Sequence, residues 1–268
     1  MKSGEESSGQ NQMPLFRELL SGMRSSFNLL FPNRCLFCHN LLDTRWCVCS
    51  NCLAEIPILV EDVCSRCGAP LNYCEASERT AISDYQDRCY HCRELDFDFQ
   101  KNESLGVFDG MMRELIHQFK FGGRRSLFRV FSELLLVHKA SYIREHDAII
   151  PVPLSQARFR ERGFNQSYMI GKTIAVSTNI PFLGNILLRR GRSKPQSSIK
   201  SLRERRENLT DRFFLRKKGK EMVRGKSILL IDDVLTTGAT ASACARVLYL
   251  GGAVRVNLLS MARALREP

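Results

Sequence analysis

Ser227-Ile-Leu-Leu-Ile-Asp-Asp-Val-Leu-Thr-Thr-Gly-Ala-Thr240 is the stretch of this 268-residue sequence that decides the fold. It opens with apolar residues that do not alternate with polar ones, which predicts a strand, Ser227–Ile231, covered on both faces. Two acids, Asp232 and Asp233, follow at the expected strand end, and a helix is predicted from Thr240 to Leu250. A buried strand, a short loop and a helix in this order favour a parallel sheet in an α/β fold.

The loop between this strand and helix has the chemistry of an anion site. Backbone amides of such a loop, together with a helix N-terminus, cradle phosphate. Gly238 would let the backbone approach a ligand closely. The residues predicted to surround the phosphate are Thr236, Thr237, Gly238, Ala239 and Thr240. The stretch lacks both familiar nucleotide motifs, G-x-x-x-x-G-K-[ST] and G-x-G-x-x-G.

The two acids narrow the class of ligand. Carboxylates beside a bare phosphate would repel it, so the ligand should also offer hydroxyl donors, with a divalent cation nearby. A ribose 5-phosphate meets this condition, with its phosphate in the loop and its 2′- and 3′-hydroxyls on Asp232 and Asp233.

Outward from this stretch, residues 101–268 continue the alternation of strands and helices, and Gly122-Gly123 and Gly251-Gly252 are predicted stops. The further helices are expected at Met111–Phe121, Leu127–Arg144 and Gln166–Ser177, and the further strands at Ala148–Val152 and Ala253–Ser260.

Residues 34–100 hold ten of the eleven cysteines and few long apolar runs. Eight of the ten form C-x-x-C pairs, and two such pairs supply the four thiolates of a closed, structural zinc site. Two Zn²⁺ ions are therefore predicted. The expected ligands are Cys35, Cys38, Cys49, Cys52, Cys64, Cys67, Cys89 and Cys92.

Pairing in sequence order is the simplest assignment of these ligands, and an interleaved arrangement is the alternative. Cys47 and Cys74 are spare, and Cys47 could replace Cys49. Residues 1–100 carry nine Lys/Arg and fourteen Asp/Glu, and thiolates add negative charge. Because nucleic acid prefers a basic surface, a scaffold or partner-docking role suits this acidic segment better.

The net charge of +12 comes from the rest of the chain, with fifteen Lys/Arg and four Asp/Glu within residues 189–226. Such a run is either a solvated surface or a site for a polyanion, namely polyphosphate or nucleic acid.

Composition at the N-terminus predicts a disordered tail over residues 1–13 and an amphipathic helix over Pro14–Phe31. No apolar run is long enough to span a bilayer, and the polar start argues against a secretory signal, so a cytoplasmic protein is expected. The expected domains are residues 1–33 (tail and helix), 34–100 (double zinc ribbon) and 101–268 (the α/β domain).

The Ile228–Thr240 stretch resembles the signature of type I phosphoribosyltransferases, which bind 5-phosphoribosyl 1-pyrophosphate (PRPP). From about Phe31 to Ala262, the chain resembles the ComF family of competence-associated proteins, which carry an N-terminal double zinc ribbon. The segments that carry this second resemblance are Lys120–Gly123, Ile150–Leu154, Arg162–Gln166, Gln196, Arg206–Asn208 and Phe213.

The resemblance implies a type I phosphoribosyltransferase-like parallel sheet flanked by helices, with a small N-terminal cysteine-rich zinc-ribbon domain. It further implies Mg²⁺-dependent PRPP binding. Pyrophosphate would meet Arg158, Arg160, Arg162 and Gly163, and Lys194, Arg203 and Arg206 would lie on a mobile flap. The expected catalytic residues are Asp232, Asp233, Arg162 and Arg206.

Three functions remain open at this point. The first is a phosphoribosyltransferase that transfers ribose 5-phosphate to a nitrogen nucleophile and releases pyrophosphate. The second is a non-catalytic module of DNA uptake, which binds single-stranded DNA through residues 189–226 or binds proteins of the uptake machinery. The third is a sensor in which PRPP changes the binding of a partner. A pocket for the acceptor would have to come from the zinc half or from Phe182–Leu215.

Overall fold

A computed structural model describes residues 33–42, 47–60, 62–71, 88–89, 92, 97–190 and 211–265. The predicted tail, the Pro14–Phe31 helix, Cys74 and the flap residues Lys194, Arg203 and Arg206 lie outside these residues. The chain forms two compact units, Met1–Glu55 and Ile56–Pro268. The second cysteine tetrad therefore belongs to the same unit as the sheet. The domain boundaries given above stay a prediction.

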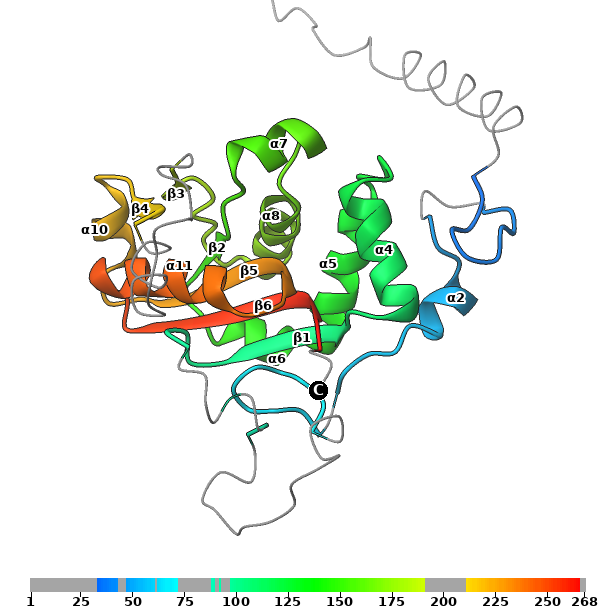
Figure 1. The fold of residues 1–268 in the computed structure, drawn as a ribbon, viewed down its shortest axis with the longest axis horizontal. Helices are drawn as coiled ribbons and strands as arrows, with labels where there is room; N and C mark the ends of the chain where they lie inside the picture. The colour runs from blue at the N-terminus through cyan, green and yellow to red at the C-terminus, as the bar shows by residue number, and fades with distance from the viewer. Residues whose placement is uncertain are drawn as a thin grey trace, which may run out of the picture. The chain divides into compact units, whose positions relative to one another are not determined.

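The second unit is built on a sheet of four parallel strands (Figure 1). Their spatial order is β1 (Asn102–Val107), β6 (Arg255–Arg263), β5 (Ser227–Leu235) and β2 (Ala148–Pro151). β5, which carries the two acids, is therefore an inner strand, and its neighbours align Ile231 with Pro151 and Asp232 with Ser260. This arrangement confirms the predicted parallel sheet.

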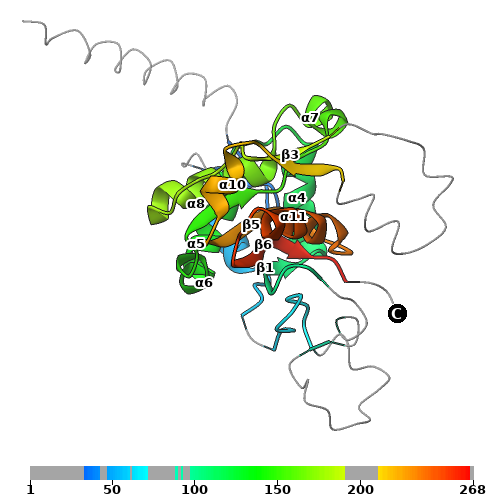
Figure 2. The same cartoon turned by 90° about the vertical axis from the view of Figure 1, so that its left-hand side faces the viewer.

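Helices cover both faces of the sheet, and Figures 1 and 2 show α5 and α8 on one side and α11 on the other. α8 (Gln166–Thr178) packs closely, because Gly171 leaves room for Ile149 and Ile231. On the other face, Ile228 and Leu230 share a buried cluster with α11 (Ala239–Leu250). Successive residues of β5 thus point to opposite layers, as the pleat of a strand requires.

The remaining elements surround this frame. They are α2 (Ser50–Ala54), α4 (Gly110–Lys120), α5 (Leu127–His138), α6 (Ala140–Arg144), α7 (Gln156–Arg162) and α10 (Gly219–Val223), with an antiparallel pair of strands, β3 (Leu187–Arg189) and β4 (Phe213–Leu215). No helix among the described residues is long and apolar enough to cross a membrane.

The structure changes three of the expected elements. The strand expected over Ala253–Ser260 is β6, which runs from Arg255 to Arg263. The single helix predicted over Leu127–Arg144 is two helices, α5 and α6, which meet at Lys139 with a non-helical φ of −128°. Lys139 is buried there, and its ammonium donates to the carbonyl of Leu59 at 2.9 Å. The strand expected to end at Ile231 continues to Leu235, because β6 extends alongside it as far as Arg263.

Candidate functional site

Each cysteine tetrad brings four sulfur atoms within 4.8 Å of one another. The tetrads are Cys35/Cys38/Cys49/Cys52 and Cys64/Cys67/Cys89/Cys92, so the ligands group in sequence order. The Sγ atoms of Cys38 and Cys49 are 3.7 Å apart, and those of Cys67 and Cys89 are 3.6 Å apart. Tetrahedral zinc with Zn–S bonds of about 2.3 Å separates its sulfurs by about 3.8 Å. Both tetrads are thus consistent with structural zinc sites.

Backbone amides prepare the first tetrad for a thiolate. Burial disfavours the charged form of Cys35, but the backbone N–H groups of Cys38, Cys49 and Phe37 outweigh it and lower the Cys35 pKa to about 6. Cys49 caps the N-terminus of α2 by accepting from the N–H of Cys52. The sulfur of Cys49 is one of the four that lie close together in this tetrad. Cys47, two residues earlier in the sequence, is also buried but is not a member of the tetrad.

The phosphate loop, which we define as Thr236–Thr240, runs from the carboxyl end of β5 into the first turn of α11. Thr236 and Thr237 are exposed, so their hydroxyls are open to a ligand. Gly238 caps the helix in the left-handed conformation, at φ +75°. A Cβ at this position would also lie 2.4 Å from the ring of Phe97. Residue 238 must therefore be glycine for two reasons: its left-handed backbone conformation and the lack of room for a Cβ beside Phe97.

The two acids face different surroundings, since they are adjacent on a strand. Asp233 lies among cations: its Oδ2 is 2.7 Å from Nζ of Lys120 and 3.5 Å from Nη1 of Arg162. Both cations are largely buried, with 14% and 6% of their side chains exposed. Asp232 points toward the α11 layer. Its Oδ1 accepts from the N–H of Asp233 at 2.8 Å.

The environment of Asp232 favours its neutral form. Burial, followed by the negative charge of Asp233, raises the pKa of Asp232 to about 7. The N–H of Asp233 and the cations Lys120 and Arg158 oppose this shift without cancelling it. A ligand that brings hydroxyl donors or positive charge would therefore find a carboxyl group poised to ionise near neutral pH.

Donors without partners lie beside Asp233. Nη1 of Arg162 donates to the side-chain oxygen of Gln166 at 3.3 Å, and the guanidinium lies over the ring of Phe121. Within the described residues, Nε of Arg162 and Nε2 of Gln166 are buried and have no hydrogen-bond partner. Buried donors without partners are costly, which points to a polar ligand here.

Arg263 was not among the residues singled out from the sequence, although it supports the phosphate loop. It is buried, and its Nη1 lies 2.9 Å from the carbonyl of Leu235 and 2.6 Å from that of Thr236. An arginine directly after the mostly apolar stretch Leu258–Ala262, which Ser260 interrupts, was the available signal, but the strand was predicted to end at Ser260. Lys120 was noted only as part of a motif.

Of the other basic residues predicted to line the site, the structure brings only Arg162 into contact with Asp233 among those it describes. Arg162 ends α7 and reaches Asp233, while Gly163 follows with a left-handed φ of +74° that turns the chain. Arg158 and Arg160 lie on exposed positions of the same helix. Arg206 lies outside the described residues, so its proposed role stays a prediction.

A cavity of about 680 Å³ opens at the carboxyl end of β2. Its walls are mostly apolar, and several polar side chains, among them Gln156, Asn165 and Asn185, interrupt them. Gly163, next to Arg162, also lines it. The apolar part of the lining includes Pro151, Pro153, Phe159, Phe164, Tyr168 and Leu187.

The sheet, the loop and the cysteine tetrads together define a protein of the type I phosphoribosyltransferase-like class with N-terminal zinc ribbons. Within that class, most of the chain is similar to the competence proteins F and ComFC and to the DNA utilization protein YhgH. Residues 26–93 match the double zinc ribbon domain.

Three relatives illustrate this similarity. Competence protein F of Haemophilus influenzae is 29% identical over 87% of this chain and 98% of its own length. DNA utilization protein YhgH of Escherichia coli K12 is 27% identical over 88% of this chain and its full length. Competence protein ComFC of Bacillus subtilis is 28% identical over 81% of this chain and 84% of its own length.

Solved structures of adenine phosphoribosyltransferases are more distant. The Leishmania donovani enzyme is 16% identical and matches 60% of this chain and 71% of its own, with a TM-score of 0.37. The Saccharomyces cerevisiae enzyme is 16% identical, with a TM-score of 0.34 over 54% and 72%. The fold class itself follows from the parallel sheet and the position of the phosphate loop.

Proposed function

We propose that this chain binds PRPP with Mg²⁺ and transfers its ribose 5-phosphate to a nitrogen nucleophile. The observation that carries the proposal is the junction of β5 and α11. There, an exposed loop with two threonine hydroxyls and a helix N-terminus begins three residues after the second of two acids on an inner parallel strand. Such junctions bind phosphate groups, and the acids suit a ligand that also carries hydroxyl donors.

The phosphate loop would hold the 5-phosphate through its amides and the hydroxyls of Thr236, Thr237 and Thr240. Asp232 and Asp233 would accept from the ribose hydroxyls. Lys120 and Arg162, which Asp233 now holds in place, would then face the pyrophosphate. Mg²⁺ supplies positive charge to the pyrophosphate when it is bound. Because the two acids point to opposite layers, they fit a Mg²⁺ held mainly by ligand oxygens and water.

In the proposed transfer, the bond between ribose C1 and the pyrophosphate oxygen breaks, and a bond from C1 to the acceptor nitrogen forms. The pyrophosphate leaves with the bonding electrons, and the nitrogen loses a proton to solvent. Positive charge at the leaving group and alignment of the acceptor supply the catalysis. The cavity at the carboxyl end of β2 has the size of small-molecule sites and offers rings and amides to a flat heterocyclic acceptor.

Calorimetry with PRPP, with and without Mg²⁺, tests the binding step. We expect binding by the wild-type chain, and a loss of affinity of at least about tenfold in Asp233→Asn and in Thr237→Val, equal to about 1.4 kcal/mol. Glu221→Gln, an exposed acid on α10, is the matched control and should bind as the wild type does. If PRPP gives no heat and protects no residue from exchange, the proposed function is wrong.

Release of pyrophosphate tests the transfer step separately. A panel of purine and pyrimidine bases and simple amines should include an acceptor that releases pyrophosphate with the wild type and not with Arg162→Met. PRPP binding without release for every acceptor would contradict the transfer and leave a binding protein.

A second function, binding of single-stranded DNA, is favoured by the names of the relatives and by the described surface around α10. Arg216, Lys217, Lys218, Lys220 and Arg224 are all exposed there. The affinity of such a surface for DNA falls as salt rises, with a logarithmic slope of about −0.7 for each phosphate neutralised on a single strand.

The salt slope of an oligonucleotide titration tests this second function. Replacing Arg216, Lys217 and Lys218 by Gln should reduce the slope by about 2. DNA affinity that does not depend on salt, or a slope that the triple variant leaves unchanged, would reject this surface.

A further inference from the structure

The second cysteine tetrad and the phosphate loop are connected through a short segment, Phe97–Asn102. The connection begins at Arg66, which lies between two ligands of the tetrad, Cys64 and Cys67. Its guanidinium crosses to this segment: Nη2 donates to the carbonyl of Phe97 at 2.5 Å and Nη1 to that of Gln100 at 2.8 Å. The turn that holds two of the sulfurs thus also fixes two backbone carbonyls of the connecting segment.

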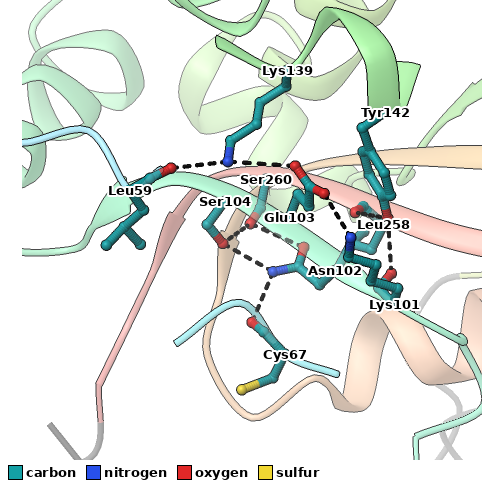
Figure 3. Close-up of polar contacts among 10 residues, drawn as sticks. All are labelled: Leu59, Cys67, Lys101, Asn102, Glu103, Ser104, Lys139, Tyr142, Leu258 and Ser260. Atoms are coloured by element: carbon teal, nitrogen blue, oxygen red, sulfur yellow. Dashed lines mark hydrogen bonds and ion pairs between the residues drawn. The ribbon is translucent and has the colours of Figure 1, made fainter. Parts of the chain in front are cut away.

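The same turn is tied to the sheet through Asn102, the first residue of β1 (Figure 3). The backbone N–H of Asn102 donates to the carbonyl of Arg66, and its side-chain amide donates to the carbonyl of Cys67, both at 2.9 Å. Asn102 is fully buried and also bonds to Ser104 and Ser260. A buried network in which every member has a partner restricts each of its members to one position.

The other end of the segment rests on the first turns of α11. The N–H of Asp98 donates to Oγ of Ser242 at 2.8 Å. The carboxylate of Asp98 receives a forked pair of bonds from Arg246, at 3.1 and 3.2 Å. These contacts fix the segment to the helix whose N-terminus forms part of the phosphate loop.

Phe97 completes the connection because its ring lies directly against Gly238. The ring is 6% exposed and stacks on Phe99 with 4.7 Å between centroids. It fills the space where a Cβ of residue 238 would be. A ring in this position blocks movement of Gly238 toward Phe97 and so supports the left-handed turn that presents the loop amides.

Packing of an ordinary core is the alternative explanation for these contacts. An ordinary core would hold the segment whether or not a metal is bound. Here, however, four buried cysteines of the tetrad are part of the same cluster as Phe97 and Phe99. Without a metal, four thiols or thiolates within 4.8 Å offer little cohesion, whereas Zn²⁺ binding supplies folding free energy directly.

We propose that the metal bound by the second tetrad sets the order of the phosphate loop, and through it the affinity for PRPP. Arg66 and Phe97 are the positioning residues that connect the two. The ligand named here rests on the proposed function, but the mechanical connection does not. Coupling between two sites of this kind changes affinity by about 5- to 150-fold.

Hydrogen exchange of the full-length, zinc-loaded protein tests the connection without PRPP. In the wild type, removal of zinc by a chelator should raise exchange at residues 236–242 at least about fivefold, while Ile228–Ile231 stays protected. In Phe97→Ala, exchange at 236–242 should already be raised with zinc bound, and the chelator should add little. Phe97→Leu should restore part of the protection.

Arg66→Met tests the polar half of the connection, and Arg129→Met is its control, because Arg129 is an exposed arginine of α5. Zinc content, measured by atomic absorption, should stay at two per chain in both variants. PRPP affinity should fall about tenfold in Arg66→Met and stay unchanged in Arg129→Met.

The outcomes separate this proposal from the proposed function. Exchange at 236–242 that responds neither to zinc removal nor to Phe97→Ala overturns the connection, whatever PRPP does. If the exchange responds as expected and PRPP does not bind, the connection stands and the proposed ligand is wrong. If PRPP binds equally to wild type, Arg66→Met and Phe97→Ala, the effect on affinity is refuted.

Discussion

Asp232 and Asp233 are neighbours in sequence, yet the pleat of β5 gives them opposite tasks. Asp233 joins two cations, Lys120 and Arg162, to the carboxyl end of the sheet. Asp232 lies on the α11 side, where burial raises its pKa to about 7. Asp233 thus holds two cations in place, while the pKa of Asp232 lies close to neutral pH.

The raised pKa of Asp232 predicts how stability depends on pH. From about pH 4 to pH 7 the folded chain keeps a proton that the unfolded chain has lost, so the free energy of unfolding falls as pH rises through this window. Asp232→Asn mimics the protonated acid, so in this variant the free energy of unfolding should no longer fall with pH because of residue 232. In calorimetric melts, the Tm of the variant relative to wild type should rise by at least about 3 °C between pH 5 and pH 8.

Glu221→Gln serves as the control for this pH dependence, because Glu221 is exposed on α10. Its Tm difference from wild type should be the same at both pH values. An equal difference at pH 5 and pH 8 for Asp232→Asn would mean that Asp232 is ionised throughout.

Gly238→Ala should disrupt the phosphate loop for two separable reasons. The left-handed φ of +75° costs an alanine about 1–2 kcal/mol, and the new Cβ would meet the ring of Phe97. We expect urea unfolding to show a loss of at least about 2 kcal/mol. Adding Phe97→Leu should recover only the steric part. Full recovery in the double variant would show that the backbone conformation contributes nothing.

Among the helices and strands, those with a clear pattern of apolar residues were predicted from the sequence, and several without such a pattern were missed. The stretch from β5 to α11 is continuous in sequence, and it was located from apolar residues, acids and loop chemistry. β1 was missed because its sequence, Asn-Glu-Ser-Leu-Gly-Val, reads as polar. Asn102 and Ser104 are buried there only because they bond to each other, Cys67 and Ser260. α7 was missed because its two apolar residues, Ala157 and Phe159, are exposed, so no apolar period marks it.

The partners of the site could not be predicted for a different reason. Lys120 reaches Asp233 across more than a hundred residues, and Arg263 reaches the loop from the adjacent strand. Such contacts depend on strand order, which the sequence does not encode locally. The cysteine tetrads, in contrast, were grouped correctly because tetrahedral zinc chemistry constrains the spacing of its ligands.

Arg263→Met tests whether the end of β6 supports the phosphate loop. The change would remove the donor to the carbonyl of Thr236 and one of two donors to the carbonyl of Leu235, which would keep the N–H of Ala264. We expect a loss of stability of about 2–4 kcal/mol in urea unfolding and a clear rise of hydrogen exchange at residues 236–240. Arg255→Met, on the first residue of the same strand, should leave exchange in the loop unchanged. If hydrogen exchange at residues 236–240 were the same in Arg263→Met and Arg255→Met, Arg263 would not support the phosphate loop.

At the level of the whole molecule, the two compact units are held together internally by different forces. The described part of the second unit has a large apolar core around the sheet. In the described part of the first unit, the buried apolar residues are Cys35, Cys47, Val48 and Cys52. Three of these four are cysteines, so little apolar area is available to offset the entropy of ordering the chain.

Loss of the first metal should therefore unfold the first unit and spare the sheet. In Cys35→Ser, which removes one ligand of the first tetrad, we expect about one zinc per chain and hydrogen exchange at residues 33–55 near the rate of an unfolded chain, since metal binding supplies the folding free energy there. The strands β5 and β6 should keep their protection. Cys244→Ser, a buried cysteine of α11 outside both tetrads, is the control and should retain two zinc ions and a protected first unit. Protection of residues 33–55 in Cys35→Ser, with the metal shown to be lost, would mean that contacts other than zinc hold this unit.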